Sequence, residues 1–250
     1  MKISSLSVVL PAHNEEGSVE SVVANVHRVL ENLGMDHEIL LVDDGSTDRT
    51  GELGRRMESE IPGMRLVQHF PSRGYGGALK AGFAAATCDW IAFYPADGQF
   101  VFGEIERLIA KTRSAEIVSG YRADRKDILI RRFNALAWKS LVVLLFGRLC
   151  RDIDCGFKLF RRQILSQVVL EGNGATLDTE LLAGAKAVGY RIDEVEVTHL
   201  PRMSGKATGA DLKVILRALR DLPRFRMRLS RDLSSHKFTR VLPKAVPEEI

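Results

Sequence analysis

Apolar and polar positions alternate in blocks along the first half of the chain, and these blocks predict strands and helices in turn. Residues 6–12, LSVVLPA, form a short continuous apolar run, as expected for a strand that is buried on both faces. Residues 17–33 instead place valine and leucine three or four positions apart, which is the spacing of an amphipathic helix. By the same criteria we expect further strands within 38–48, at 64–70, at 89–97 and near 116–121, and further helices ending near 58, at 76–86 and near 103–113.

Strands that alternate with helices pair in parallel, with helices on both faces of the sheet, so we expect an α/β domain. In such sheets ligands bind at the carboxyl ends of the strands. Polar residues gather at four of these ends: His13, Asn14, Glu15 and Glu16; Asp43 and Asp44; Ser72 and Arg73; Asp97 and Gln99. Any one group could simply cap a helix. Four groups on one rim favour a binding site.

The second half of the chain contains two unusual helical segments. Residues 131–149, RRFNALAWKSLVVLLFGRL, predict a very apolar helix that is suited either to dip into a bilayer or to pack in a core or a dimer. Residues 176–202 predict a helix, a turn and a strand, and a basic loop follows at 203–211. The next segment predicts a basic amphipathic helix that ends or kinks at Pro223. Its apolar face is formed by Leu212, Ile215, Leu219 and Leu222.

Charge is unevenly distributed along the chain, whose net charge is +4. From Arg202 onward there are 12 Lys and Arg against 5 Asp and Glu, and before it 24 against 27. A basic tail indicates either a solvated helix or contact with a polyanion or an anionic membrane surface. The longest apolar stretch, 140–147, is far shorter than the ~20 residues of a spanning helix. Three cysteines suggest a reducing, cytoplasmic location.

The chain has no internal repeat and no long linker. We therefore expect one catalytic domain, residues 1–208, followed by an appendage, residues 209–250, that holds the basic helix and a frayed tail.

Eight segments, in order, resemble the family-two glycosyltransferases with the GT-A fold, and most closely the dolichol- and polyprenyl-phosphate sugar synthases. They are VVLPAHNEE (8–16), ILLVDDGSTDRT (39–50), RGYGGALKAG (73–82), ADGQF (96–100), GYR (120–122), RDIDCGFKLFRR (151–162), TELLAGAKAVGYRIDEVEV (179–197) and RMSGKAT (202–208). The resemblance implies a Rossmann-like, mainly parallel sheet. It also implies an inverting, metal-dependent transfer of a sugar from a UDP- or GDP-sugar to a polyprenyl phosphate, peripherally at the cytoplasmic membrane surface.

The resemblance also assigns roles to individual positions. The nucleotide would be held by Pro11, Asn14, Glu15, Asp43, Asp44 and Arg73. Asp97 and Gln99 would hold Mg²⁺ or Mn²⁺ on the diphosphate. The acceptor phosphate would meet Arg122, Arg131 and Arg132, and Arg202 and Lys206 would close over the donor. Asp97, Arg122, Arg131, Arg202 and Lys206 are thus the implied catalytic residues.

The chain departs from the family pattern at two positions. Pro95 stands where the family often has a second acid, two residues before Asp97, so we expect weaker metal binding in the absence of donor. The rival interpretation is that the metal role is lost and that Arg202 and Lys206 neutralise the leaving group. Cys155 stands where lipid-phosphate synthases commonly have serine, and a thiol is a poorer hydrogen-bond donor.

The nature of the acceptor decides whether a base is needed. A lipid phosphate is already an anion, whereas a sugar hydroxyl would need a general base. Asp178 and Glu180 are the candidates for that base, although Asp178 also suits charge pairing at a helix N-terminus.

Three other functional classes remain to be weighed. A nucleotide-sugar-binding protein of weak activity would account for Pro95. A dinucleotide-dependent dehydrogenase is disfavoured because GYGGAL (74–79) has leucine at the third glycine position and follows the third strand. Nucleic-acid binding is disfavoured because no pattern of stacking aromatic residues accompanies the basic tail. Partners other than substrates would be a second copy of the chain or a separate membrane anchor.

Overall fold

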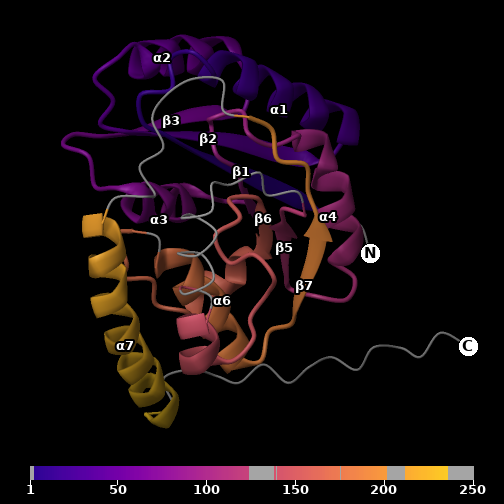
Figure 1. The fold of residues 1–250 in the computed structure, drawn as a ribbon. Coiled ribbons are helices and arrows are strands. Elements are labelled where there is room, and N and C mark those ends of the chain that lie inside the picture. The colour runs from indigo at the N-terminus through magenta and orange to yellow at the C-terminus, as the bar shows by residue number, and fades with distance from the viewer. Residues whose placement is uncertain (1–2, 124–137, 139, 175, 202–211, 236–250) are drawn as a thin grey trace, which may run out of the picture.

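The computed structural model describes residues 3–123, 138, 140–174, 176–201 and 212–235, with side chains from 220 onward in the last of these ranges. Its centre is a seven-stranded sheet in the order β3-β2-β1-β4-β6-β5-β7 (Figure 1). The strands are β1 (Ser5–Ala12), β2 (Asp36–Asp44), β3 (Met64–His69), β4 (Trp90–Phe93), β5 (Ile117–Tyr121), β6 (Lys158–Arg161) and β7 (Ile192–Glu196).

Helices cover both faces of this sheet, as the continuous apolar strands predict. One face carries α1 (Val19–Leu33), α2 (Thr50–Glu60) and α4 (Ile105–Lys111), and the other carries α3 (Tyr75–Ala85), α6 (Thr176–Val188) and α7 (Leu212–Ser234) (Figure 1). Short 3₁₀ turns occur at Phe102–Glu104 and Arg162–Ser166. Neighbouring residues of β1 alternate between the two cores: Val8 packs with α1, and Val9 packs with α3.

The parallel strands end level with one another. β1 pairs with β2 so that Ala12 lies opposite Asp43, and β2 pairs with β3 so that Asp44 lies opposite His69. The carboxyl ends of these strands therefore form one rim, as the sequence predicts.

Strand β6 was not predicted from the sequence. It has only four residues, lies in a charged segment, and runs antiparallel between β4 and β5. The predicted strand at 89–97 is also shorter than expected, because β4 ends at Phe93, two residues before Pro95.

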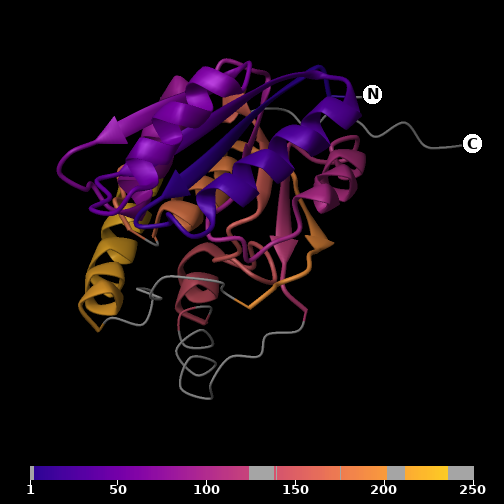
Figure 2. The same cartoon turned by 90° about the horizontal axis from the view of Figure 1, so that it is seen from above.

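The first alternative for Pro223, that the last helix ends there, is wrong, because α7 continues through it to Ser234. The second alternative, a kink at Pro223, stays a prediction. Its apolar residues Leu222, Phe225 and Leu229 are buried in the core shared with α6. The helix ending at residue 146 packs beside it, with the rings of Phe146 and Phe225 5.2 Å apart. Figure 2 shows both helices extending from the same side of the sheet. The division at residue 208 and the frayed tail stay predictions.

No helix in the described ranges is both long and apolar enough to cross a bilayer. Residues 138 and 140–146 are helical, and the first part of the apolar segment 131–149 lies outside the described residues.

Glu38, near the amino end of β2, connects three segments. Its carboxylate accepts hydrogen bonds from Ser7 Oγ (2.6 Å), from the Thr87 backbone N–H (2.6 Å) and hydroxyl (2.8 Å), and from Arg65 Nη2 (2.6 Å). Burial would raise the pKa of Glu38, but these hydrogen bonds lower it to about 2. Because this pKa lies below the ordinary value of 4.5, the carboxylate stabilises the fold fully above pH ~4.5 and progressively less as the pH falls towards 2.

We predict that Glu38→Gln lowers the free energy of unfolding at pH 7 by ~1–3 kcal/mol, because donors are left facing an amide. The difference from wild type should shrink as the pH falls from 4.5 towards 2, which urea unfolding at a series of pH values measures. Glu106→Gln, which changes an exposed carboxylate on α4, is the matched control. A constant difference at every pH would contradict the ionisation argument.

Candidate active site

Two loops at the carboxyl rim are joined by hydrogen bonds between backbone and side chains. Asn14 has a left-handed backbone conformation (φ 56°), which asparagine tolerates better than most residues. Its side-chain oxygen accepts a hydrogen bond from Thr47 N (2.8 Å), and its own N–H donates to Ser46 Oγ (2.9 Å). Glu15 N donates to Thr50 Oγ1 (2.8 Å). The loop after β1 and the loop after β2 are thereby fixed relative to each other.

The loop after β1 also contacts the loop after β4. The Ser18 hydroxyl lies 2.8 Å from the carbonyl of Ala96 and 3.0 Å from the carboxylate of Glu15, so its one hydrogen is shared between these two acceptors. Ala96 N donates to the carbonyl of Pro11 (3.3 Å). These contacts hold Asp97 beside the end of β1. Pro11, Glu15 and Asp97 are therefore neighbours at the rim.

Asp44 is a structural residue of the site. Its two oxygens accept hydrogen bonds from His69 Nδ1 (3.0 Å), Ser72 Oγ (2.6 Å), Arg73 N (2.9 Å) and Gly74 N (2.8 Å). Burial raises the pKa of Asp44, but these hydrogen bonds lower it below its ordinary value. Four donors saturate the acceptor capacity of a carboxylate. The geometry thus favours a role in shaping the 72–74 loop over contact with a nucleotide.

Asp43 keeps more acceptor capacity than Asp44. It accepts from Ser46 N (3.1 Å) and from Gln68 Nε2 (2.9 Å). It is packed closely against α2, because a Cβ atom on Gly51 would lie 2.7 Å from Asp43 Oδ2. Of the two adjacent acids, Asp43 is therefore the better candidate for a ribose or a base. The side chain of Arg73 is exposed at the same rim.

Asp97 and Gln99 lie in a turn that the chain orders from two sides. Gln99 N donates to Asp97 Oδ1 (3.1 Å), and Leu200 N donates to the carbonyl of Gln99 (2.7 Å). The side-chain nitrogen of Gln99 donates to the carbonyl of Leu200 (3.3 Å), which turns its amide oxygen to the opposite side. Carboxylate and amide oxygens are the ligands that Mg²⁺ and Mn²⁺ prefer. The donor set therefore fits such an ion.

Pro95 stands at the position where the family often has a second acid, and its ring packs against a neighbouring turn. A Cβ atom on Gly156 would lie 2.6 Å from Pro95 Cγ, so the proline ring rests directly on the backbone of the turn before β6. The imidazole of His199 lies beside the turn that holds Asp97 and Gln99, because Phe100 and His199 form a β-bridge, with ring centroids 5.3 Å apart.

Arg122 is held by Asp152 at the end of β5. Its Nε and Nη2 atoms donate to the two carboxylate oxygens at 2.7 and 2.9 Å. Burial lowers the pKa of Arg122, but Asp152 raises it above its ordinary value, so the guanidinium stays charged. The paired Asp152 fixes the orientation of the guanidinium, and its contact with an acceptor phosphate stays a prediction.

Cys155 packs in the core. Its side chain is fully buried against Gly120, and burial raises the pKa of the thiol to about 11. This placement agrees with the sequence argument that Cys155 is a poor partner for a phosphate.

Lys158 is the most deeply buried cation of the described residues, with a fully inaccessible side chain. Its ammonium group donates to the carbonyls of Ile153 (2.9 Å) and Cys155 and to Asp178 Oδ1 (2.7 Å). It also lies 5.0 Å from the centre of the Phe93 ring. Burial lowers the pKa of Lys158, but the carboxylate of Asp178 raises it above its ordinary value. Lys158 therefore ties β6 to the preceding turn and to α6.

Neither candidate base is available without rearrangement. Asp178 is buried against Lys158, and burial raises its pKa against the opposing effect of that lysine. Glu180 accepts from the N–H groups of Glu171 (2.8 Å) and Gly172 (3.0 Å) and lies 3.4 Å from Arg228. Both carboxylates thus hold structure together, and their role as base stays a prediction.

The structure brings several of the predicted site residues together at the rim: Pro11, Asn14, Glu15, Asp43, Asp44, Arg73, Asp97 and Gln99. Arg131, Arg132, Arg202 and Lys206 lie outside the described residues. Sequence reasoning missed Asp152, Lys158 and His199. The signal for the first two was the charged segment RDIDCGFK, whose lysine alternates with apolar residues in a strand too short to recognise.

A family model and curated relatives match most of this chain. A model of glycosyl transferase family 2 matches residues 7–169. Two curated proteins named undecaprenyl-phosphate 4-deoxy-4-formamido-L-arabinose transferase are similar over 216 residues. The protein from Enterobacter sp. (strain 638) is 31% identical and that from Edwardsiella ictaluri (strain 93-146) is 30% identical. The match covers 85% of this chain but only 65% of the length of these relatives.

The fold is also shared with solved structures. Glucosyl-3-phosphoglycerate synthase from Mycobacterium tuberculosis, in complex with Mn²⁺, UDP and phosphoglyceric acid, superposes with a TM-score of 0.64 at 21% identity. The superposition covers 90% of this chain and 78% of that structure. A second structure of the same enzyme, with UDP alone, gives a TM-score of 0.66.

We predict that Lys158→Met destabilises the fold by ~3–5 kcal/mol, because it leaves the Asp178 carboxylate buried without a counter-charge. The double variant Lys158→Met/Asp178→Leu should recover part of that loss, which equilibrium urea unfolding measures. Lys111→Met removes an exposed ion pair with Asp193 and should cost less than ~1 kcal/mol. Equal destabilisation of the single and double variants would show that the electrostatic pair is not what holds β6.

Proposed function

Because the chain belongs to glycosyl transferase family 2, we propose that it transfers a sugar from a UDP- or GDP-sugar to a polyprenyl phosphate at the cytoplasmic surface of a membrane, with inversion at the anomeric carbon. The observation that carries this proposal is the rim itself. There, Asp43 and Asp97 are fixed beside the end of β1, with an arginine held at the end of the neighbouring half of the sheet.

The first part of the proposal, the binding of the sugar donor, rests on the loops after β1 and β2. Asp43 retains lone pairs for ribose hydroxyls or a base N–H, and charged acceptors make the stronger hydrogen bonds. UDP in the solved structures of the same fold supports a nucleoside diphosphate at this rim. The choice between uridine and guanosine is left to experiment.

The second part of the proposal, the binding of a cation, assigns Mg²⁺ or Mn²⁺ to Asp97 and the amide oxygen of Gln99. Such an ion, when bound, neutralises charge on the departing diphosphate. The residues of the chain fix where it can bind: Leu200 orients the Gln99 amide, and the backbone N–H of Gln99 orients Asp97. Pro95 adds no charge, so a bound diphosphate would supply the remaining oxygen ligands.

The third part of the proposal, the identity of the acceptor, is supported by the names of the curated relatives, which specify undecaprenyl phosphate. A phosphate oxygen would attack the anomeric carbon while the bond to the nucleoside diphosphate breaks, and the electron pair would leave with the diphosphate. No base is needed, because the nucleophile is already an anion. Arg122 would orient this phosphate, since the planar guanidinium matches its oxygens and Asp152 holds it in place. Arg131 and Arg132 are proposed as further contacts to it, and Arg202 and Lys206 as contacts to the donor phosphates.

A hydroxyl acceptor is the runner-up. It would require Asp178 or Glu180 to leave its partners and accept a proton, and the buried pairs described above oppose this. A nucleotide-sugar-binding protein of weak activity, suggested by Pro95, is the other alternative.

Attachment to a membrane surface is supported by the outer face of α7. Arg220, Arg224, Met227 and Arg231 recur at three- and four-residue spacing, opposite the buried residues of the helix, and all four are exposed. Leu144, on the neighbouring helix, is 80% exposed. A basic face that includes an exposed apolar side chain, Met227, suits an anionic lipid surface. A second copy of the chain or a separate anchoring protein could add to this contact.

We predict that the protein forms a glycolipid from a UDP- or GDP-sugar and polyprenyl phosphate, and that Asp97→Asn lowers kcat/KM by at least ~100-fold, as the loss of one electrostatic group at a transition state does. The assay follows nucleoside diphosphate release and glycolipid together, with Mn²⁺, Mg²⁺ or EDTA. Asp36→Asn changes an exposed carboxylate at the opposite edge and should behave as wild type.

Each alternative gives a different result in this assay. Activity that survives EDTA would retain the transferase and remove the cation from it. Nucleoside diphosphate release onto a hydroxyl acceptor only would overturn the lipid-phosphate acceptor. Tight donor binding without any turnover would support the binding protein.

We also predict that replacing Arg220, Arg224 and Arg231 by glutamine weakens binding to vesicles containing anionic lipid by about tenfold or more, given ~1 kcal/mol for each basic residue at the surface. Cosedimentation measures the bound fraction. The same charge change at three exposed arginines elsewhere, Arg28, Arg55 and Arg113, is the control. Equal loss in both triple variants would show that net charge, and not this face of α7, governs the binding.

A further inference from the structure

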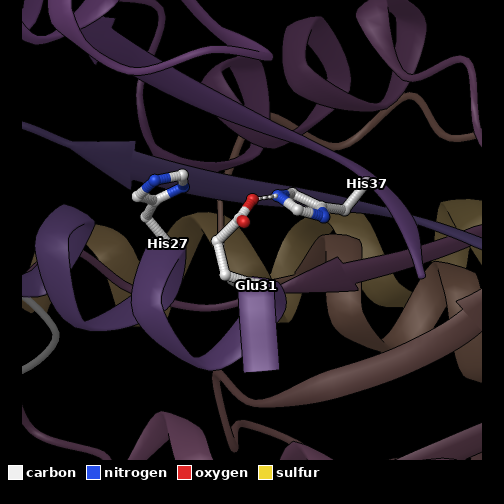
Figure 3. A group of neighbouring side chains, drawn as sticks. All are labelled: His27, Glu31 and His37. Carbon is white, nitrogen blue, oxygen red and sulfur yellow. Dashed lines mark ion pairs between the residues drawn. The ribbon is translucent and has the colours of Figure 1, made fainter. Parts of the chain in front are cut away.

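Three potential metal ligands meet at the edge of the sheet opposite the candidate active site. His27 and Glu31 lie four residues apart on α1, so they share one face of the helix, and His37 lies at the start of β2. One ligand atom from each residue lies within 4.8 Å of those of the other two. In Figure 3 the carboxylate of Glu31 lies between the two imidazole rings.

His37 is oriented as a metal-binding histidine usually is. Its Nδ1 lies 2.9 Å from the backbone carbonyl of Met35. A carbonyl only accepts, so Nδ1 carries hydrogen, and in the neutral ring the lone pair is on Nε2. Ligating histidines commonly use a backbone carbonyl in this way to fix the tautomer.

That lone pair points at a carboxylate, which is unfavourable unless a cation lies between them. His37 Nε2 is 3.5 Å from Glu31 Oε1. This is longer than the ~2.7–2.9 Å of a charge-assisted hydrogen bond. Two ligands of a tetrahedral Zn²⁺, each ~2.0–2.2 Å from the ion, stand about 3.4 Å apart. The observed separation thus fits a shared metal better than a shared proton.

His27 supplies an independent observation. Its Nδ1 is buried and has no hydrogen-bond partner among the described residues. A buried polar atom in this state destabilises a fold unless something satisfies it. The His27 and His37 rings lie 6.3 Å apart between centroids, with Glu31 exposed on the solvent side. A small rotation of the exposed Glu31 side chain and of His27 would bring the three ligands around one ion.

We propose that His27, Glu31 and His37 form a binding site for Zn²⁺ or a similar first-row transition metal. Two imidazoles and one carboxylate suit such ions, whereas Mg²⁺ prefers oxygen ligands only. The fourth position is open to water. The site joins the second half of α1 to the start of β2, across the turn at Gly34, and its role is to hold these two elements together.

This site is separate from the candidate active site. His37 lies seven residues before Asp44 along β2, which is about 23 Å of extended strand. The proposal is independent of the transferase reaction, so either can fail without the other.

The test is a titration of untagged, metal-free protein with Zn²⁺ by isothermal calorimetry, in the presence of millimolar Mg²⁺ to occupy oxygen-only sites. We expect one Zn²⁺ per chain, and tetrahedral visible absorption bands when Co²⁺ replaces it. His27→Gln and His37→Gln should each weaken Zn²⁺ binding at least about 100-fold, since even the loss of a residue behind the ligands costs 10–100-fold. At 100 times the dissociation constant, Zn²⁺ should raise the Tm of wild type by about 5–10 °C.

Two controls separate the site from general effects. Glu106→Gln removes an exposed carboxylate on α4 and should bind Zn²⁺ as wild type does. The two histidine variants should retain sugar transfer and their folded Tm without metal. Zn²⁺ binding that is absent in wild type, or unchanged in both histidine variants, would overturn the proposal and leave Glu31 and His37 as a surface ion pair.

Discussion

The buried ammonium group of Lys158 is the interaction on which both halves of the sheet depend. β6 runs against the direction of its neighbours, and Lys158 is its first residue, opposite Phe93 on one side and Ser119 on the other. A charge with no access to water persists only when its donors are satisfied, and here two carbonyls and Asp178 do so. The same carbonyls belong to the turn that carries Asp152. Lys158 therefore positions Arg122 indirectly, by fixing the carboxylate that holds it.

The other side of the rim, at the loops after β1 and β2, is the side proposed to bind the sugar donor. There the fixed charges are carboxylates instead of a buried ammonium group, and backbone N–H groups surround them. The hydrogen bonds of Asp44 all go to the 69–74 segment, whereas the adjacent Asp43, buried near the end of β2, accepts from Ser46 and Gln68. Rigid placement matters because catalysis by positioning loses much of its advantage when groups are displaced by even 1 Å. The two halves meet where the ring of Pro95 rests on the backbone of Gly156.

Much of this arrangement could be predicted from the sequence, because it follows from local patterns. Uninterrupted apolar runs between helices specify strands buried on both faces, and acids at their ends specify the rim. The features that could not be predicted, such as β6 and the burial of Lys158, depend on pairing between segments that are distant in the sequence. A four-residue strand such as β6 has no periodicity of its own, and Lys158 looks exposed until Asp178 is known to face it. Pro223 is misleading for a related reason. Packing of Leu222 and Phe225 against α6 stabilises α7 by more than one missing hydrogen bond costs, so tertiary contacts override the local signal.

Helix α1 and strand β2 link the candidate active site to the opposite edge of the sheet. α1 starts just after Glu15 and ends near Glu31, and β2 starts near His37 and ends at Asp44. The loops that build the donor side of the rim are thus the direct continuations of the segments that carry His27, Glu31 and His37. Because packed cores transmit displacement with little compression, any contact that fixes α1 against β2 at the amino edge also limits how far the loops after β1 and β2 can move apart at the carboxyl edge. If both proposed sites bind their ions, the imidazoles at one edge and the oxygen-only ligands at the other would keep two kinds of cation apart.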